Sequence, residues 1–133
     1  MRLQLEAMMN KRFSLGRTFI TQGAMTYCED NNIDYVELTI RHTVGDFGTI
    51  GHLDNAQLTR AERLHGPYLT YDGLKLNAVA ILDKQGIVLS IYQSPSPMDD
   101  TQIWIETQLA DDKTYTTISL PSEYLGTATH IPV

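Results

Sequence analysis

The chain has 133 residues and a mass of 15.0 kDa, a size that fits one domain with a single hydrophobic core. Hydrophobic residues make up 42% of it and charged residues 20%, which excludes a disordered or collagen-like chain. Sixteen acidic against ten basic side chains give a net charge of −6, and the basic ones are scattered, which disfavours a non-specific nucleic-acid binder.

Two features of the sequence concern the compartment. Cys28 is alone, so it forms no internal disulfide, and the neighbouring Glu29 and Asp30 disfavour its thiolate, which indicates a structural cysteine in a reducing compartment. No segment approaches the ~18 apolar residues of a membrane-spanning helix, and the start lacks the apolar run of a secretory signal. We therefore expect a cytoplasmic protein with no membrane partner, translated from Met1 or Met9.

The first half of the chain has helical signals. A short helix is predicted over residues 24–29, because turn-prone residues precede it at 21–23 and Asn31-Asn32 follows it. A capping box, Thr59 to Glu62, predicts another helix over residues 59–64.

Between these two lies the segment 34–44, whose pattern is ambiguous. Apolar residues at Val36, Ile40 and Val44 share one helical face, whereas Val36, Leu38 and Ile40 also alternate as in a strand. A capping box from Asp34 to Glu37 and the glycine at position 45 favour the helix. Residues 41 and 42 would then occupy its last turn, where the helix dipole favours cations.

The second half has strand signals. Turns are indicated at 71–73, 83–86 and 111–113, and two prolines interrupt the chain at 94–97. The stretches between them predict four strands, at residues 74–82, 87–92, 102–107 and 115–120.

These elements predict an α+β domain with two to three N-terminal helices packed on a four-stranded antiparallel β-meander. Residues 13–124 form the domain, with a flexible N-terminal extension at 1–12 and a C-terminal tail at 125–133. Alternation in the last two strands makes one sheet face apolar. The polar face would carry Trp104, Glu106, Thr107, and Thr116 or Thr117.

One octapeptide, Arg41-His42-Thr43-Val44-Gly45-Asp46-Phe47-Gly48, gathers a cation, an imidazole and a carboxylate around two glycines. His42 titrates near neutral pH, so it is the best candidate for a general acid or base at an exposed corner. The competing interpretation is a helix-end histidine, with Asp46 paired to Arg41. The four histidines lack metal-site spacing, Ser14 and Ser90 lack a neighbouring base in sequence, and we expect no metal and no cofactor.

Six short motifs together resemble a family of small proteins found on bacterial plasmids, integrative elements and phages. The match spans most of residues 13–124, and the family has no established activity. The chain differs from the common pattern in having Phe47 in place of Trp and a longer segment between Gly48 and Asn77. The motifs are Phe13-x-Leu15-Gly16, Thr21-x-Gly23-Ala24, Arg41-His42-x-x-Gly45-Asp46-Phe47-Gly48, Leu89-Ser90-x-Tyr92, Ile103-Trp104-Ile105-x-Thr107 and Thr116-Thr117-x-x-Leu120-Pro121-x-Glu123-Tyr124.

More distantly, the order of elements is similar to the barnase, colicin D and RelE group of ribonuclease toxins. In those enzymes a histidine and polar strand residues perform acid–base and phosphate-stabilising work. The resemblance would place such roles at Arg41, His42, Asp46, Thr107 and Thr117.

Two functions follow as hypotheses. The first is a small acidic accessory protein of a mobile genetic element that binds a host protein and inhibits a defence or nucleic-acid-processing complex. The alternative is a metal-independent ribonuclease using His42, the only case in which nucleic acid is a partner. The sequence favours binding over catalysis without settling the question, and it leaves a homodimer open. The predicted binding residues are Arg41, His42, Asp46, Phe47, Trp104 and Glu106.

Overall fold

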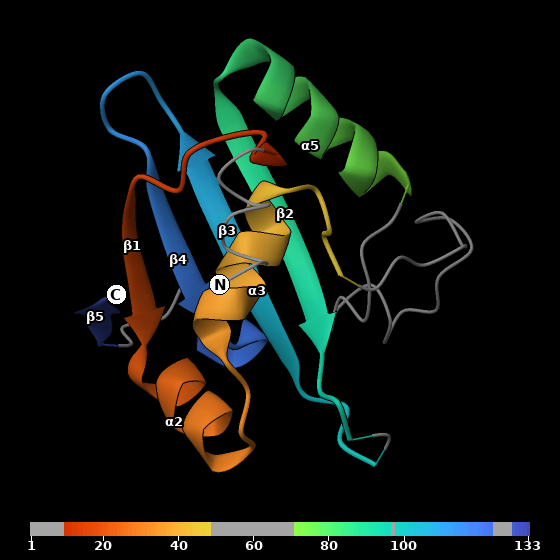
Figure 1. Cartoon of the computed structure of the whole chain (residues 1–133), viewed down its shortest axis with the longest axis vertical. Coiled ribbons are helices and arrows are strands. Elements are labelled where there is room, and N and C mark those ends of the chain that lie inside the picture. The colour runs from red at the N-terminus through yellow and green to blue at the C-terminus, as the bar shows by residue number, and fades with distance from the viewer. Residues whose placement is uncertain (1–9, 49–70, 97, 124–128) are drawn as a thin grey trace.

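The computed structural model describes residues 10–48, 71–96, 98–123 and 129–133. Within them the protein is α+β, with three α-helices and a mixed five-stranded sheet (Figure 1). In chain order the elements are β1 (Arg17–Thr21), α2 (Gln22–Asp30), α3 (Tyr35–Thr43), α5 (Tyr71–Asp83), β2 (Gly86–Gln93), β3 (Gln102–Leu109), β4 (Tyr115–Ser119), the 3₁₀ turn η1 (Pro121–Glu123) and β5 (His130–Pro132).

The sheet has the strand order β2-β3-β4-β1-β5. Strands β2, β3 and β4 form an antiparallel meander, and β1 pairs with β4 in parallel. The last strand, β5, pairs antiparallel with the other edge of β1. The predicted α+β class is therefore confirmed. The four-stranded antiparallel meander is confirmed only for its last three strands, since the sheet is mixed and has five.

The segment predicted as the first strand of the meander, residues 74–82, is instead the helix α5. Its buried residues Asn77 and Ala80 are three positions apart, as on a helix, and they face β2. Apolar residues on its outer side, such as Val79 and Leu82, alternate in sequence with those on its inner side, so residues 78–82 are all apolar and match the pattern of a buried strand. The turn predicted at 71–73 is the first turn of this helix.

Strands β1 and β5 were not predicted, and β5 falls within the expected C-terminal tail. Both depend on long-range pairing: Ile20 of β1 lies opposite Ile118 of β4 on one side and Ile131 of β5 on the other. A five-residue and a three-residue strand without a local hairpin turn carry little periodic signal. Their position becomes fixed only when the sheet assembles.

The helices predicted around residues 24–29 and 34–44 are confirmed as α2 and α3. Thr21 caps α2 by accepting a hydrogen bond from the Ala24 N–H, and Asp34 caps α3 by accepting from the N–H groups of Val36 and Glu37. The helix predicted at 59–64 lies outside the described residues. None of the described helices has the length and apolar character needed to cross a membrane.

Helices α2 and α3 lie against one face of the sheet, and α5 runs beside β2 (Figure 1). The main core between helices and sheet contains Ile20, Ala24, Cys28, Leu38, Tyr92, Ile103, Ile105 and Ile118. Cys28 is fully buried there, and burial together with the Glu29 charge raises the pKa of its thiol to about 11. A protonated, inaccessible thiol agrees with the structural role expected for this residue.

Candidate functional site

The octapeptide 41–48 forms the C-terminal end of α3 and the start of the next segment. The helix ends with a Schellman motif, in which the N–H of Gly45 donates to the carbonyl of His42 and the N–H of Asp46 donates to the carbonyl of Arg41. Gly45 has φ +92°, which L-residues with a side chain rarely adopt. The predicted glycine stop is confirmed, and so is the position of Arg41 and His42 in the last helical turn.

The residues after this stop run against the outer edge of β2. The Ile91 N–H donates to the carbonyl of Phe47 over 3.0 Å, and Gly48 forms a parallel bridge with Ile91. A Cβ at position 48 would lie 2.0 Å from the Ile91 carbonyl oxygen, so only glycine fits this approach. Farther along the same edge, the side-chain amide of Asn77 donates to the Leu89 carbonyl and accepts from the Leu89 N–H. These contacts occupy backbone groups that an edge strand would otherwise expose.

The structure places His42 inside the protein, in contrast to the exposed corner expected from the sequence. Its side chain is 0% exposed. Nδ1 lies 2.5 Å from the Ser90 hydroxyl oxygen and Nε2 lies 2.9 Å from the Thr107 hydroxyl oxygen. Phe13 and Phe47 meet the imidazole edge to face on either side. Both ring nitrogens are thus engaged within an apolar surrounding.

The hydrogen-bond chain determines which nitrogen carries the proton. Thr116 donates its hydroxyl proton to the Leu15 carbonyl, so in the short contact between Thr107 and Thr116 it is Thr107 that donates. Thr107 then has no proton left for the imidazole and accepts from Nε2–H of His42. Nδ1 is consequently the acceptor, and Ser90 donates to it. The neutral imidazole satisfies every member of this chain.

Burial also fixes the charge state of His42. The loss of solvation lowers the pKa of the imidazole to about 3, because no carboxylate stands beside it to stabilise the cation. A histidine with this pKa is neutral at physiological pH. It is also out of reach of solvent, which does not favour its use as a general acid or base on a bound substrate.

The other residues assigned to the ribonuclease alternative do not gather into one site. Thr107 is fully buried next to His42, whereas Thr117 alternates to the opposite face of the sheet, where it lies across from Glu106. Ser90, which has no base near it in sequence, has His42 as a neighbour in space, but it is 0% exposed. It is therefore a donor that orients the imidazole and not an accessible nucleophile.

The predicted binding residues divide among three places. Phe47, like His42, is buried in the core. Trp104 and Glu106 point to the sheet face opposite that of Thr107, because side chains alternate along β3. In the octapeptide Asp46 is exposed and Arg41 is partly exposed, and the two form an ion pair with 2.7 Å between Nε and Oδ2.

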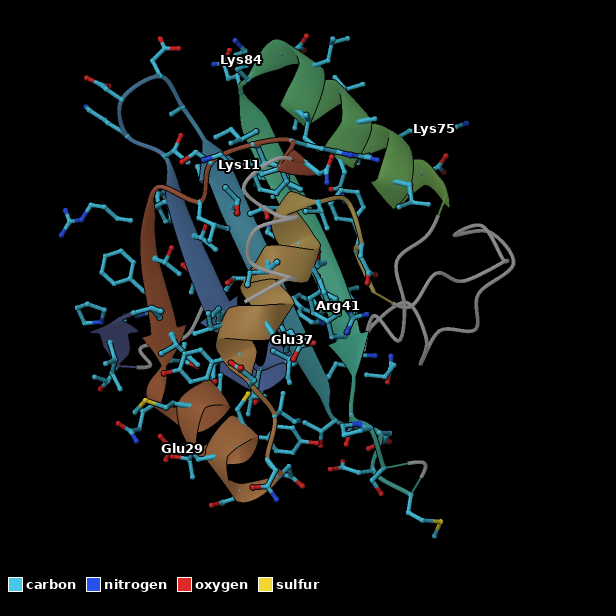
Figure 2. The ribbon with its side chains drawn as sticks, in the orientation of Figure 1. Lys11, Glu29, Glu37, Arg41, Lys75 and Lys84 are labelled. Atoms are coloured by element: carbon cyan, nitrogen blue, oxygen red, sulfur yellow. The ribbon has the colours of Figure 1, made fainter. Side chains whose placement is uncertain are left out.

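A cleft of about 460 Å³ opens between the first turns of α3 and the end of β2. Figure 2 shows Glu37 and Arg41 projecting from successive turns of α3 on the same side of the molecule. Its lining combines exposed charged groups with apolar and aromatic side chains, of which Leu38, Tyr92 and Ile103 are buried. The lining residues are Asn32, Ile33, Asp34, Glu37, Leu38, Arg41, Gly48, Tyr92, Gln93, Pro95 and Ile103.

The cation of this cleft is held in place. The Arg41 guanidinium is bonded to Asp46 and lies 4.7 Å above the centre of the Tyr92 ring. The Tyr92 hydroxyl donates to the backbone carbonyl of Asp46, which connects all three residues. The hydrogen bond that Arg41 donates to Asp46 raises the pKa of the guanidinium. Partial burial acts to raise the pKa of Asp46, but the bond and charge of Arg41 leave it below its ordinary value.

The remaining charge of the cleft is negative. Asp34 and Glu37 line it and are exposed. The Glu37 charge also acts on Arg41 and contributes to the raised pKa of the guanidinium. Asp99 lies at the same end of the molecule, because it accepts a hydrogen bond from the Tyr27 hydroxyl of α2, and bonds from Thr101 and Tyr27 lower its pKa to about 2. With the Arg41 charge balanced by Asp46, the cleft presents carboxylates above an apolar floor.

Sequence reasoning singled out Arg41, which lines this cleft, and its partner Asp46, but it missed Glu37 and Tyr92. Glu37 was interpreted only as part of the α3 capping box, and Tyr92 only as a strand residue. Glu37 lies four residues before Arg41 on the same face of the helix, and this spacing is the one sequence signal that the two side chains lie close together. No local pattern indicated Tyr92, which arrives from β2.

Among the side chains that the structure describes, no group of three His, Cys, Asp or Glu is placed to hold a metal ion. We compared the chain with protein-family models, with curated proteins and with solved structures, and none of the three comparisons gave a match.

Proposed function

We propose that the protein is a small acidic accessory protein of the kind carried by mobile genetic elements, and that it acts by binding another protein. The observation that carries this proposal is that the octapeptide 41–48 contributes one charged-group pair to an open cleft and one imidazole to the core. Its titratable imidazole is buried as part of the core, while its ion pair stiffens the wall of an open cleft. A rigid, mainly acidic cleft is suited to recognition.

The chemistry of the cleft indicates the kind of group it accepts. Ile33, Leu38 and Ile103 provide an apolar floor on which the methylene stem of a lysine or arginine side chain can lie. Asp34 and Glu37 at the rim provide the opposite charge. We propose that the occupant is a basic side chain from a surface segment of the partner.

This partner chemistry connects the cleft to the net charge of the whole chain. A protein with a net charge of −6 is attracted to surfaces that are basic because they bind nucleic acid. Occupying such a surface would inhibit a host defence or nucleic-acid-processing complex by competing with its substrate.

The ribonuclease alternative stays an untested prediction. The burial of His42 and the separation of Thr107 from Thr117 across the sheet give it no support in this conformation. A ribonuclease would need another general base or a rearrangement that exposes the imidazole.

The proposal is tested by capturing partners from a lysate of the host cell with immobilised wild-type protein. Glu37→Lys should weaken retention of the captured protein by about tenfold, because it replaces an attraction with a repulsion at the cleft. Asp112→Lys is the matched control, since it makes the same change of charge in the exposed β3–β4 turn. Equal retention by both variants, or capture of nothing above an unrelated acidic protein, would refute the proposal.

A further inference from the structure

The outer face of α5 carries a stripe of apolar side chains that the described part of the protein leaves uncovered. Leu76, Val79 and Leu82 are 68%, 54% and 81% exposed, and they recur every third residue along one side of the helix. The opposite side, with Asn77 and Ala80, packs on β2. A helix that is apolar on its solvent side as well as its core side is typical of an interaction surface.

Two of the charges beside this stripe, Lys75 and Asp83, are arranged symmetrically about its middle. Val79 is the midpoint: Leu76 and Leu82 lie three residues before and after it, and Lys75 and Asp83 lie four residues before and after it. When two such helices pack antiparallel across Val79, each Leu76 is level with the partner's Leu82. Each Lys75 is likewise level with the Asp83 of the partner helix. In a parallel arrangement like charges would be level instead.

We propose that the α5 stripe (Leu76, Val79 and Leu82, with Lys75 and Asp83) is the interface of a two-fold symmetric homodimer, with the two α5 helices antiparallel. A two-fold axis uses the same patch on both chains, and self-complementarity of charge about one residue is what such an interface requires. Lys75 projects from α5 away from the sheet (Figure 2). The cleft between α3 and the end of β2 has no residue in common with it, so both surfaces can be occupied together.

The size of the stripe sets the strength of this dimer. A helix of 13 residues is about 20 Å long, so a contact along it buries an area at the small end of specific interfaces. We expect a reversible dimer that forms at micromolar to higher concentrations. Its measurement therefore needs a concentration series.

The experiment is sedimentation equilibrium of the full chain over such a series. The wild type should approach twice the 15.0 kDa chain mass as concentration rises. Leu76→Glu combined with Leu82→Glu should keep the protein monomeric. Met98→Glu, which alters a side chain 94% exposed outside α5, should leave the dimer intact. A monomeric wild type at every concentration would overturn the proposal.

A charge-reversal cycle tests the antiparallel geometry with variants that leave the apolar stripe unchanged. Lys75→Glu and Asp83→Lys should each weaken the dimer on the order of tenfold, because each places like charges opposite one another at two symmetric positions. The double variant should restore dimerisation to near the wild-type level. If the double variant loses dimer affinity by the sum of the two single losses, the antiparallel arrangement is overturned. Far-UV circular dichroism verifies that each variant is folded.

Discussion

The buried imidazole of His42 predicts a specific acid sensitivity. In the folded protein its pKa is about 3, whereas in the unfolded chain it returns to about 6.5. Between these two values the unfolded chain binds a proton that the folded protein excludes. The free energy of unfolding must therefore fall as the pH falls through this window, and no such contribution exists above pH 6.5, where both states are neutral.

The size of the effect follows from the two pKa values. Between pH 7.5 and pH 4.5 the unfolded state binds one more proton than the folded state over about two pH units. At about 1.36 kcal/mol per pH unit, this lowers the free energy of unfolding by about 2.7 kcal/mol. That is a large part of the ~5–15 kcal/mol by which domains are stable. The lowered pKa values of Asp46 and Asp99 act mainly below pH 4.5, outside this range.

The assay is urea unfolding followed by circular dichroism at several pH values, for the wild type and for His42→Gln. The variant has no imidazole at this position and should lose about 2.7 kcal/mol of the pH dependence, whatever its stability at pH 7.5. His130→Gln, a control at an exposed histidine of β5, should keep the wild-type dependence. The reasoning would be refuted by equal pH dependence in wild type and His42→Gln, or by an imidazole resonance of His42 that titrates near pH 6.5.

Two further predictions concern the edge of β2. Asn77→Leu should lower the free energy of unfolding by ~2–4 kcal/mol, because it leaves the partly buried N–H and C=O of Leu89 without the Asn77 amide that bonds them. Ala78→Leu, on the exposed side of the same helix, should change the free energy of unfolding by less than about 0.5 kcal/mol in the same urea titration. Gly48→Ala should lower the free energy of unfolding by ~1–3 kcal/mol and increase hydrogen exchange at the Ile91 amide, because a Cβ at position 48 would lie only 2.0 Å from the Ile91 carbonyl oxygen. Unchanged exchange at that amide would contradict the proposed role of the bridge between Gly48 and Ile91.

The parts of the fold that the sequence predicted correctly are those with local signals. The Asp34 cap and the Gly45 stop bound α3 because both act on backbone groups within a few residues. Strand β1 could not be found in this way, because a five-residue strand is positioned by its pairing with β4, about a hundred residues later. Helix α5 was mistaken for a strand because both of its faces are apolar.

The site shows the same limit. The sequence could pick out the octapeptide as chemically unusual, yet it could not tell which of its side chains face solvent. His42 is buried because Ser90 and Thr107 arrive from two strands to satisfy its nitrogens, and neither residue is near it in the sequence. The pairing of Arg41 with Asp46 was foreseen, since both belong to one helix end.

The central claim is that the octapeptide contributes a structural imidazole and a recognition cleft. The most direct test is to compare His42→Gln and Glu37→Lys, both verified as folded at neutral pH, in the same capture from host lysate. We predict that His42→Gln retains the partner as the wild type does and that Glu37→Lys retains it about tenfold less tightly. Loss of the partner by folded His42→Gln, with full retention by Glu37→Lys, would contradict this account.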